Sequence, residues 1–131
     1  MVLRITPEVI SFVFGQTIEN CKPAFFDPET YELFKSDEEI PSTVPESILI
    51  EFPKIRQVDI QRAYVESLND RSILGQFRNL TDEQFWKTFW VIFDDDGIQS
   101  ARFREFERAY CLQTVIAWCN DNGIACYVAQ S

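Results

Sequence analysis

Three groups of side chains in this 131-residue sequence have types and spacings that could carry chemistry. The first is Asp94, Asp95 and Asp96 followed by Gly97, a pattern that is similar to a cation-binding loop. An EF-hand loop needs a ligand at its first position and a bidentate glutamate at its twelfth. With Gly97 at the sixth position, those places fall on Ile92 and Phe103, which cannot bind a cation. A looser Mg²⁺ site stays open, and a solvated connection is the simpler interpretation.

The second group is a set of arginines at Arg102, Arg104 and Arg108. Arg104 and Arg108 are four residues apart, so on a helix they share a face and could clamp an anion. Glu105 and Glu107 lie between them, which favours an ordinary exposed face with local ion pairs.

The third group is an aromatic stripe over residues 85–93. Two adjacent rows recur every four residues, namely Phe85, Phe89 and Phe93, and Trp86 and Trp90. A stripe this wide predicts a helix that is buried in the core. The alternative is that part of it stays exposed, because Trp and Phe side chains anchor protein interfaces.

Several kinds of chemistry lack their usual residues. The sequence has no histidine, which is the commonest general base and zinc ligand, and it has no P-loop, GxGxxG, GxSxG or HExxH motif. The four cysteines form no CxxC pair, and we interpret them as reduced thiols that mostly fill the core. They are Cys21, Cys111, Cys119 and Cys126. We therefore expect no catalytic residue, no cofactor and no metal.

The charge is strongly acidic, with 21 Asp and Glu against 12 Lys and Arg, a net charge of -9 and an isoelectric point near 4.4. Such a balance disfavours nucleic acids and anionic membranes as partners. Eight of the acidic residues lie in residues 27–51 beside a single lysine, and this stretch could attract a basic protein partner. Solubility is the alternative role. The candidate interaction surface consists of Asp27, Glu29, Glu32, Asp37, Glu38 and Glu39.

The first half of the chain predicts one helix and three strands. Thr6 and Pro7 begin a helix that extends to about Glu19. A β-hairpin follows over residues 24–34, with its turn at Asp27 to Thr30, and a third strand occupies residues 47–52.

The second half predicts four helices and a last strand. Helical periodicity covers residues 59–68, and Asp70 can cap a short helix after it. Thr81 and Gln84 form a capping box that opens the aromatic helix. The longest helix extends from Ser100 to about Asn122, with Gly123 at its left-handed end. A strand follows at residues 124–128.

Together these elements predict a single α+β domain over residues 1–131, with helices packed on one face of a small antiparallel sheet. The expected sheet contains the 24–34 hairpin, the strand at 47–52 and the strand at 124–128. The N-terminus shows no apolar signal region, and no apolar run approaches the roughly 20 residues that span a bilayer. We expect a cytoplasmic protein without a membrane partner.

Residues 80–127 resemble the carboxyl half of uncharacterised protein family 0158, a bacterial family. Residues 84–89 match its aromatic segment, Gly97 and Ile98 match its Gly-Ile pair, and residues 117–124 match its helix end. Residues 102–106 correspond to its W-Y-x-F pattern, and residues 26–33 are similar to its strand–turn–strand. The resemblance covers most of residues 24–127. It implies an architecture and no activity, because the family has none assigned.

Three functional hypotheses follow. The leading one is a non-enzymatic protein-interaction module, of the inhibitor or immunity type, whose acidic surface meets a basic partner. The second is an enzyme or ligand binder that uses carboxylates, for example Asp94 to Asp96 with a metal. The third is a structural subunit that oligomerises through exposed aromatic side chains.

Overall fold

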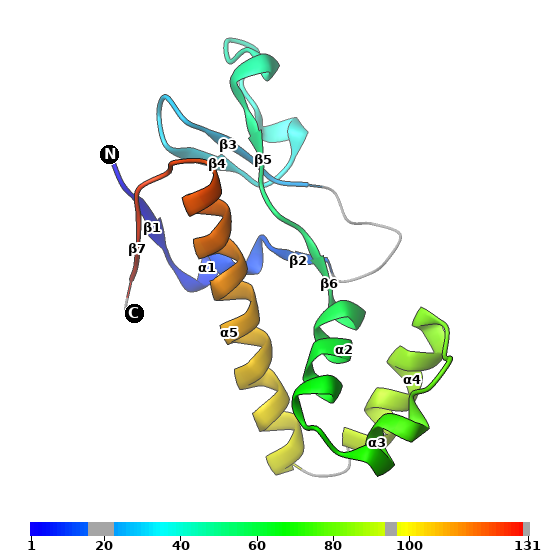
Figure 1. Cartoon of the computed structure of the whole chain (residues 1–131). Helices are drawn as coiled ribbons and strands as arrows, with labels where there is room; N and C mark the ends of the chain where they lie inside the picture. Colours follow the sequence, from blue (N-terminus) through cyan, green and yellow to red (C-terminus); the bar gives the residue numbers. More distant parts are fainter. Residues whose placement is uncertain (16–22, 94–96, 130–131) are drawn as a thin grey trace. The chain divides into compact units, whose positions relative to one another are not determined.

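The computed structural model describes residues 1–15, 23–93 and 97–129. The chain divides into two compact units, one formed by Met1–Arg56 with Cys111–Ser131 and the other by Gln57–Tyr110. Its described residues form five α-helices, two 3-10 helices and seven short strands (Figure 1). The α+β class predicted from the sequence is confirmed. A single domain over residues 1–131 stays a prediction.

The helices and strands are short except for the last helix. The α-helices are α1 (Pro7–Ser11), α2 (Gln57–Ser67), α3 (Arg71–Gln76), α4 (Asp82–Phe93) and α5 (Gly97–Asp121), and the 3-10 helices are η1 (Asp37–Glu39) and η2 (Glu46–Ile48). The strands are β1 (Leu3–Ile5), β2 (Phe14–Gly15), β3 (Phe25–Asp27), β4 (Glu32–Phe34), β5 (Ile50–Glu51), β6 (Ile55–Arg56) and β7 (Cys126–Val128).

The first unit contains a three-stranded antiparallel sheet in the order β4-β3-β5, whose strands lie side by side in Figure 1. Phe26 of the central strand pairs with Leu33 on one side and with Ile50 on the other. The hairpin predicted over residues 24–34 is confirmed. The strand predicted at residues 47–52 is shorter than expected, because η2 takes up its first part and β5 has two residues.

Asp27 closes the hairpin turn. Its carboxylate Oδ1 accepts a hydrogen bond from the backbone N–H of Glu29 at 2.9 Å, and its carbonyl accepts one from the N–H of Tyr31 at 2.8 Å. Tyr31 adopts a left-handed backbone with φ 61°, which strains a residue with a Cβ. Its ring packs edge-to-face on Phe26 with centroids 5.2 Å apart, and this contact offsets the strain.

Trp118 of α5 attaches the helix to this sheet. Its ring meets Phe26 and Phe52 edge-to-face, with centroids 5.4 Å and 4.9 Å away. Its indole N–H donates to the backbone carbonyl of Glu51 at 3.0 Å. Both phenylalanines are fully buried, so this contact forms the core between the sheet and the end of α5.

The last strand lies elsewhere than predicted. β7 does not join the hairpin sheet but pairs in parallel with β1, with Leu3 opposite Cys126 and Ile5 opposite Val128. Leu3 and Ile5 of β1 are buried, so this strand pair contributes apolar side chains to the core. The partner strand comes from the opposite end of the sequence, and a three-residue segment leaves too little pattern to indicate it.

The first helix is shorter than predicted. Thr6 caps it as expected, since its hydroxyl accepts from the N–H of Val9 at 3.2 Å, but α1 ends at Ser11 and the chain continues into β2. Residues far away in the sequence donate hydrogen bonds to the backbone carbonyls that would accept intrahelical hydrogen bonds if the helix continued. The Lys54 ammonium donates to the Phe12 carbonyl at 3.1 Å. The Ile55 N–H donates to the next carbonyl, at position 13, at 2.7 Å. The rest of the predicted helix, residues 16–19, lies outside the described residues.

Tyr64 is the centre of the second unit. Its ring is in edge-to-face contact with four phenylalanines at centroid distances of 5.2 to 6.1 Å. Burial raises the pKa of the Tyr64 phenol, which therefore stays neutral in this apolar setting. The four partners, which come from α4 and α5, are Phe89, Phe93, Phe103 and Phe106.

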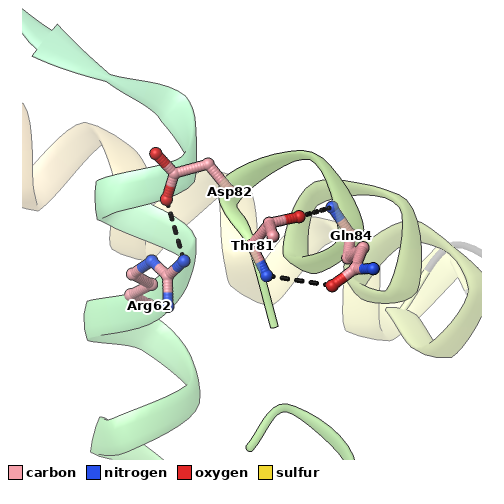
Figure 2. Close-up of polar contacts among 4 residues, drawn as sticks. All are labelled: Arg62, Thr81, Asp82 and Gln84. Atoms are coloured by element: carbon pink, nitrogen blue, oxygen red, sulfur yellow. Dashed lines mark hydrogen bonds and ion pairs between the residues drawn. The ribbon is translucent and has the colours of Figure 1, made fainter. Parts of the chain in front are cut away.

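Local capping signals are confirmed where the structure describes them. The Thr81 N–H donates to the Gln84 side-chain oxygen at 3.0 Å, and the Gln84 N–H donates to the Thr81 hydroxyl at 3.2 Å (Figure 2). Beside this capping box, the guanidinium of Arg62 on α2 pairs with the Asp82 carboxylate at 2.8 Å. The pair ties the first turn of α4 to α2, two helices of the same unit.

Two further helix ends agree with the sequence. Asp70 caps α3, and hydrogen bonds from the Ser72 hydroxyl and then from the Ile73 and Ser72 backbone lower the pKa of its carboxyl. Helix α5 begins at Gly97, three residues before the predicted Ser100, and ends at Asp121. Gly123 beyond it has φ 65°, as a left-handed cap requires.

The capping box gives a direct test of how α4 begins. Replacing Thr81 with Ala removes the acceptor of the Gln84 N–H and should lower the free energy of unfolding by about 1 kcal/mol. The matched control, Thr81→Ser, keeps the hydroxyl and should stay close to wild type. Urea denaturation followed by circular dichroism measures both. Equal stability of the Ala and Ser variants would show that the cap is not formed.

Candidate functional site

The predicted interaction surface lies on the first unit, around the hairpin and η1. Five of its six carboxylates are exposed, and we call these five the acidic surface. Across residues 1–15, 23–93 and 97–129, none of the five forms an ion pair. The acidic surface consists of Glu29, Glu32, Asp37, Glu38 and Glu39.

Asp27 is the member of the predicted set that differs. Only 2% of this residue is exposed, and its carboxylate is occupied by the turn. Asp27 therefore shapes the hairpin that carries Glu29 and Glu32, and we leave it out of the acidic surface.

Strand alternation and a 3-10 turn place the other acids on the outside. On β4, Glu32 is exposed, whereas Phe34 two residues later is buried. The chain then turns into η1, where the Lys35 N–H donates to Glu39 Oε2 at 3.1 Å. Within η1 all three side chains are acidic and exposed. The five carboxylates are thus concentrated within residues 29–39.

The aromatic helix is buried along only one of its two rows. Phe85, Phe89 and Phe93 are buried, as predicted, but Trp86 is 44% exposed. Trp90 is half-buried and its ring contacts Phe89 with centroids 5.3 Å apart. The prediction that the whole stripe belongs to the core is therefore wrong for Trp86. The phenylalanine row packs on neighbouring side chains, since Phe85 meets Phe77 and Arg62, and Phe89 meets Tyr64 and Phe103.

A polar network follows the exposed row. The Trp86 indole N–H donates to the Gln57 side-chain oxygen at 3.2 Å, and the Gln57 amide N–H donates to Glu107 at 3.2 Å. Glu107 is almost fully buried, and its other oxygen accepts from the Arg104 guanidinium at 3.0 Å. That guanidinium lies over the Trp90 ring, 5.4 Å from its centroid. Both oxygens of the buried carboxylate are satisfied, which removes most of the penalty for burying it.

This network also accounts for the arginine group. An anion clamp requires Arg104 to be available, but Glu107 and Trp90 already hold its guanidinium. Arg102 and Arg108 are exposed on the same helix. The structure thus favours the interpretation of local ion pairs over that of an anion site.

Gln61 on α2 is a buried polar residue that the sequence did not single out. It is fully buried, and neither polar atom of its amide has a hydrogen-bond partner in the part of the chain that the structure describes. Such a group destabilises a fold by about 1–3 kcal/mol. In the sequence Gln61 is one of several polar residues on a helix, so no pattern marks it as buried.

The metal hypothesis depends on residues that the structure does not describe. Asp94, Asp95 and Asp96 lie outside the described residues, as does Cys21. Elsewhere in the chain, over the described ranges, no three Asp, Glu or Cys side chains gather as a metal site. Three described cysteines are outside any disulfide, two of them buried: Cys111, Cys119 and the partly exposed Cys126. Within the described ranges, each helix is too short or too polar to cross a bilayer.

Comparison of the chain with protein-family models, with curated proteins and with solved structures finds no match. The resemblance to uncharacterised protein family 0158 therefore stays a prediction.

The two rows of α4 should respond differently to truncation. Replacing Phe89 with Ala removes a fully buried ring and should lower the free energy of unfolding by about 3–5 kcal/mol. Replacing Trp86 with Ala should lower it by only about 1 kcal/mol, because the side chain is half-exposed and Gln57 can bond to water instead. Val91→Ala, at a position that is 71% exposed, serves as the surface control. Equal losses from Phe89→Ala and Trp86→Ala would contradict the described burial.

Proposed function

We propose that this protein is a non-enzymatic protein-interaction module, of the inhibitor or immunity type, whose acidic surface docks a basic protein partner. The observation that carries the proposal is the gathering, in one short segment of the first unit, of five exposed carboxylates that form no ion pair with any residue that the structure describes. Folding does not require such a cluster, since like charges repel one another.

The hairpin that presents two of these charges, Glu29 and Glu32, is held by contacts at its turn and along its first strand. The Asp27 side chain closes the turn, and Phe26, one residue before it, packs edge-to-face against Trp118. A preorganised surface loses little conformational entropy on binding, so more of the electrostatic attraction appears as affinity. Charge complementarity acts mainly on the association rate, which suits a protein that must capture its target quickly.

The proposal keeps the expected cytoplasmic location and the exclusion of nucleic acids as partners. No specific observation on the described residues supports a carboxylate-based enzyme. One observation supports an oligomerising subunit, because Trp86 and Val91 are exposed apolar side chains on the second unit. It is therefore the second candidate function.

The test is a pair of charge reversals with equal net charge. Asp37→Lys with Glu38→Lys alters the acidic surface, whereas Glu66→Lys with Glu105→Lys places the same change on exposed positions of the second unit. Each double variant should stay within about 1 kcal/mol of wild-type stability, because surface substitutions usually change it by about 0.5 kcal/mol each.

The proposal expects capture of a basic protein from the host lysate by wild type and by the Glu66/Glu105 variant, and its loss with the Asp37/Glu38 variant. The association rate measured with the captured protein should fall steeply as salt is added. Association rates that change neither with the salt concentration nor with the Asp37/Glu38 reversal would contradict the proposal. Solubility would then be the role of the acidic surface.

A further inference from the structure

Strand β7 has two edges, and only one of them is paired among the described strands. β7 pairs in parallel with β1, and the two lie side by side as a sheet of their own (Figure 1). The Leu3 N–H donates to the Ala125 carbonyl at 2.8 Å, and the Ala129 N–H donates to the Ile5 carbonyl at 3.0 Å. These hydrogen bonds occupy the edge of β7 that faces β1.

The other edge of β7 carries backbone groups without partners. Successive residues of a strand direct their N–H and C=O groups to opposite edges, so Ala125, Tyr127 and Ala129 face β1, and Cys126 and Val128 face away from it. The backbone groups of Cys126 and Val128 form no hydrogen bond with any residue that the structure describes. An edge of this kind is a template for pairing with another strand.

The usual protections of an edge strand are missing from the sequence of β7. Lysine and proline residues normally prevent an open edge from pairing. Residues 122–131 contain no charged side chain and no proline, although the whole chain has a net charge of -9. Instead the edge exposes apolar side chains, because Tyr127 is 51% and Val128 is 45% exposed. The free edge thus combines unpaired backbone groups with apolar surface.

We propose that two copies of this chain associate through β7, whose free edges pair antiparallel about a two-fold axis at Tyr127. In this register the whole strand overlaps, with Cys126 opposite Val128 of the second copy. Both residues direct their backbone groups outward, so each such pair exchanges two N–H···O=C hydrogen bonds. Tyr127 meets its own counterpart as the non-hydrogen-bonded pair, in which side chains approach most closely. Each copy offers the same patch, as a two-fold interface requires.

The distribution of charge favours a second copy as the occupant. Two chains of net charge -9 repel each other, and like charges directly opposite each other destabilise a strand pair. Arg4 is the one charged residue of β1 and β7, and it lies opposite Tyr127 within its own copy. In the joined sheet the two Arg4 residues are three strand spacings apart, about 14 Å, which exceeds the screening length of about 8 Å. A neutral strand therefore lets two acidic chains meet.

The inference is independent of the acidic surface and of the exposed side chains on the second unit. Sedimentation equilibrium of the full chain from roughly 1 µM to 1 mM tests it, because an interface of short strands is small and its dimer is weak. We expect the mean mass to rise with concentration from 15.4 kDa toward twice that value. A wild type that stays monomeric over this range would overturn the proposal, whether or not the edge binds a strand of another protein.

Two lysine substitutions with the same change in charge locate the interface. Tyr127→Lys places like charges directly opposite each other and should keep the chain monomeric, although it lowers the net negative charge. Val91→Lys, at an exposed apolar position of the second unit, should dimerise like the wild type. Loss of the dimer with Val91→Lys alone would place the interface on the second unit and refute the pairing through β7.

Cross-linking tests the register in chains that also carry Cys21→Ser and Cys126→Ser. The other two cysteines are fully buried. Tyr127→Cys sets two thiols opposite each other with Cα atoms about 4.5 Å apart, within the range of a disulfide. Val128→Cys is the matched control, because its thiol is similarly exposed but lies diagonal to its counterpart. Mild oxidation should give a covalent dimer several times faster with Tyr127→Cys. Equal rates for the two variants would contradict the proposed pairing.

Discussion

The packing of Trp118 against the hairpin sheet is the contact on which the first unit depends. Its indole lies edge-to-face on Phe26 and Phe52, and its N–H satisfies the Glu51 carbonyl. Two aromatic contacts of this type contribute about 0.5–1.5 kcal/mol each beyond the area that they bury. A three-stranded sheet of two- and three-residue strands needs such support, since short strands alone are marginal in water.

The proposed docking surface depends in part on this attachment. Phe26 sits one residue before the Asp27 turn, so the contact that buries Phe26 also fixes the hairpin that presents Glu29 and Glu32. The part of the acidic surface that the hairpin carries thus lies on strands that this aromatic contact supports.

Local signals in the sequence predicted the elements whose cause is local. The Thr81 capping box, the Asp70 cap and the left-handed Gly123 are determined by neighbouring residues, and all three are present. The hairpin was equally predictable, because its turn is closed by Asp27 within the turn itself.

Long-range pairing and burial were not predictable in this way. The end of α1 depends on Lys54 and Ile55, which bind carbonyls far away in the sequence. β7 joins β1 at the other end of the chain. Within the candidate site, composition indicated the acidic segment but could not show that Asp27 is buried. Nor could periodicity show that Trp86 is exposed, because this depends on how many sides of α4 the rest of its unit covers.

Amide hydrogen exchange in a Trp118→Leu variant tests the dependence of the hairpin on Trp118 most directly. The reporters are the Tyr31 N–H, which bonds to Asp27, and the Phe52 N–H, which bonds to Ala24. The account predicts that both lose protection, while the Phe85 N–H, bonded to Thr81 in the second unit, exchanges as in wild type. Unchanged protection of Tyr31 and Phe52 would contradict it, because the hairpin would then be stable without the contact to Trp118.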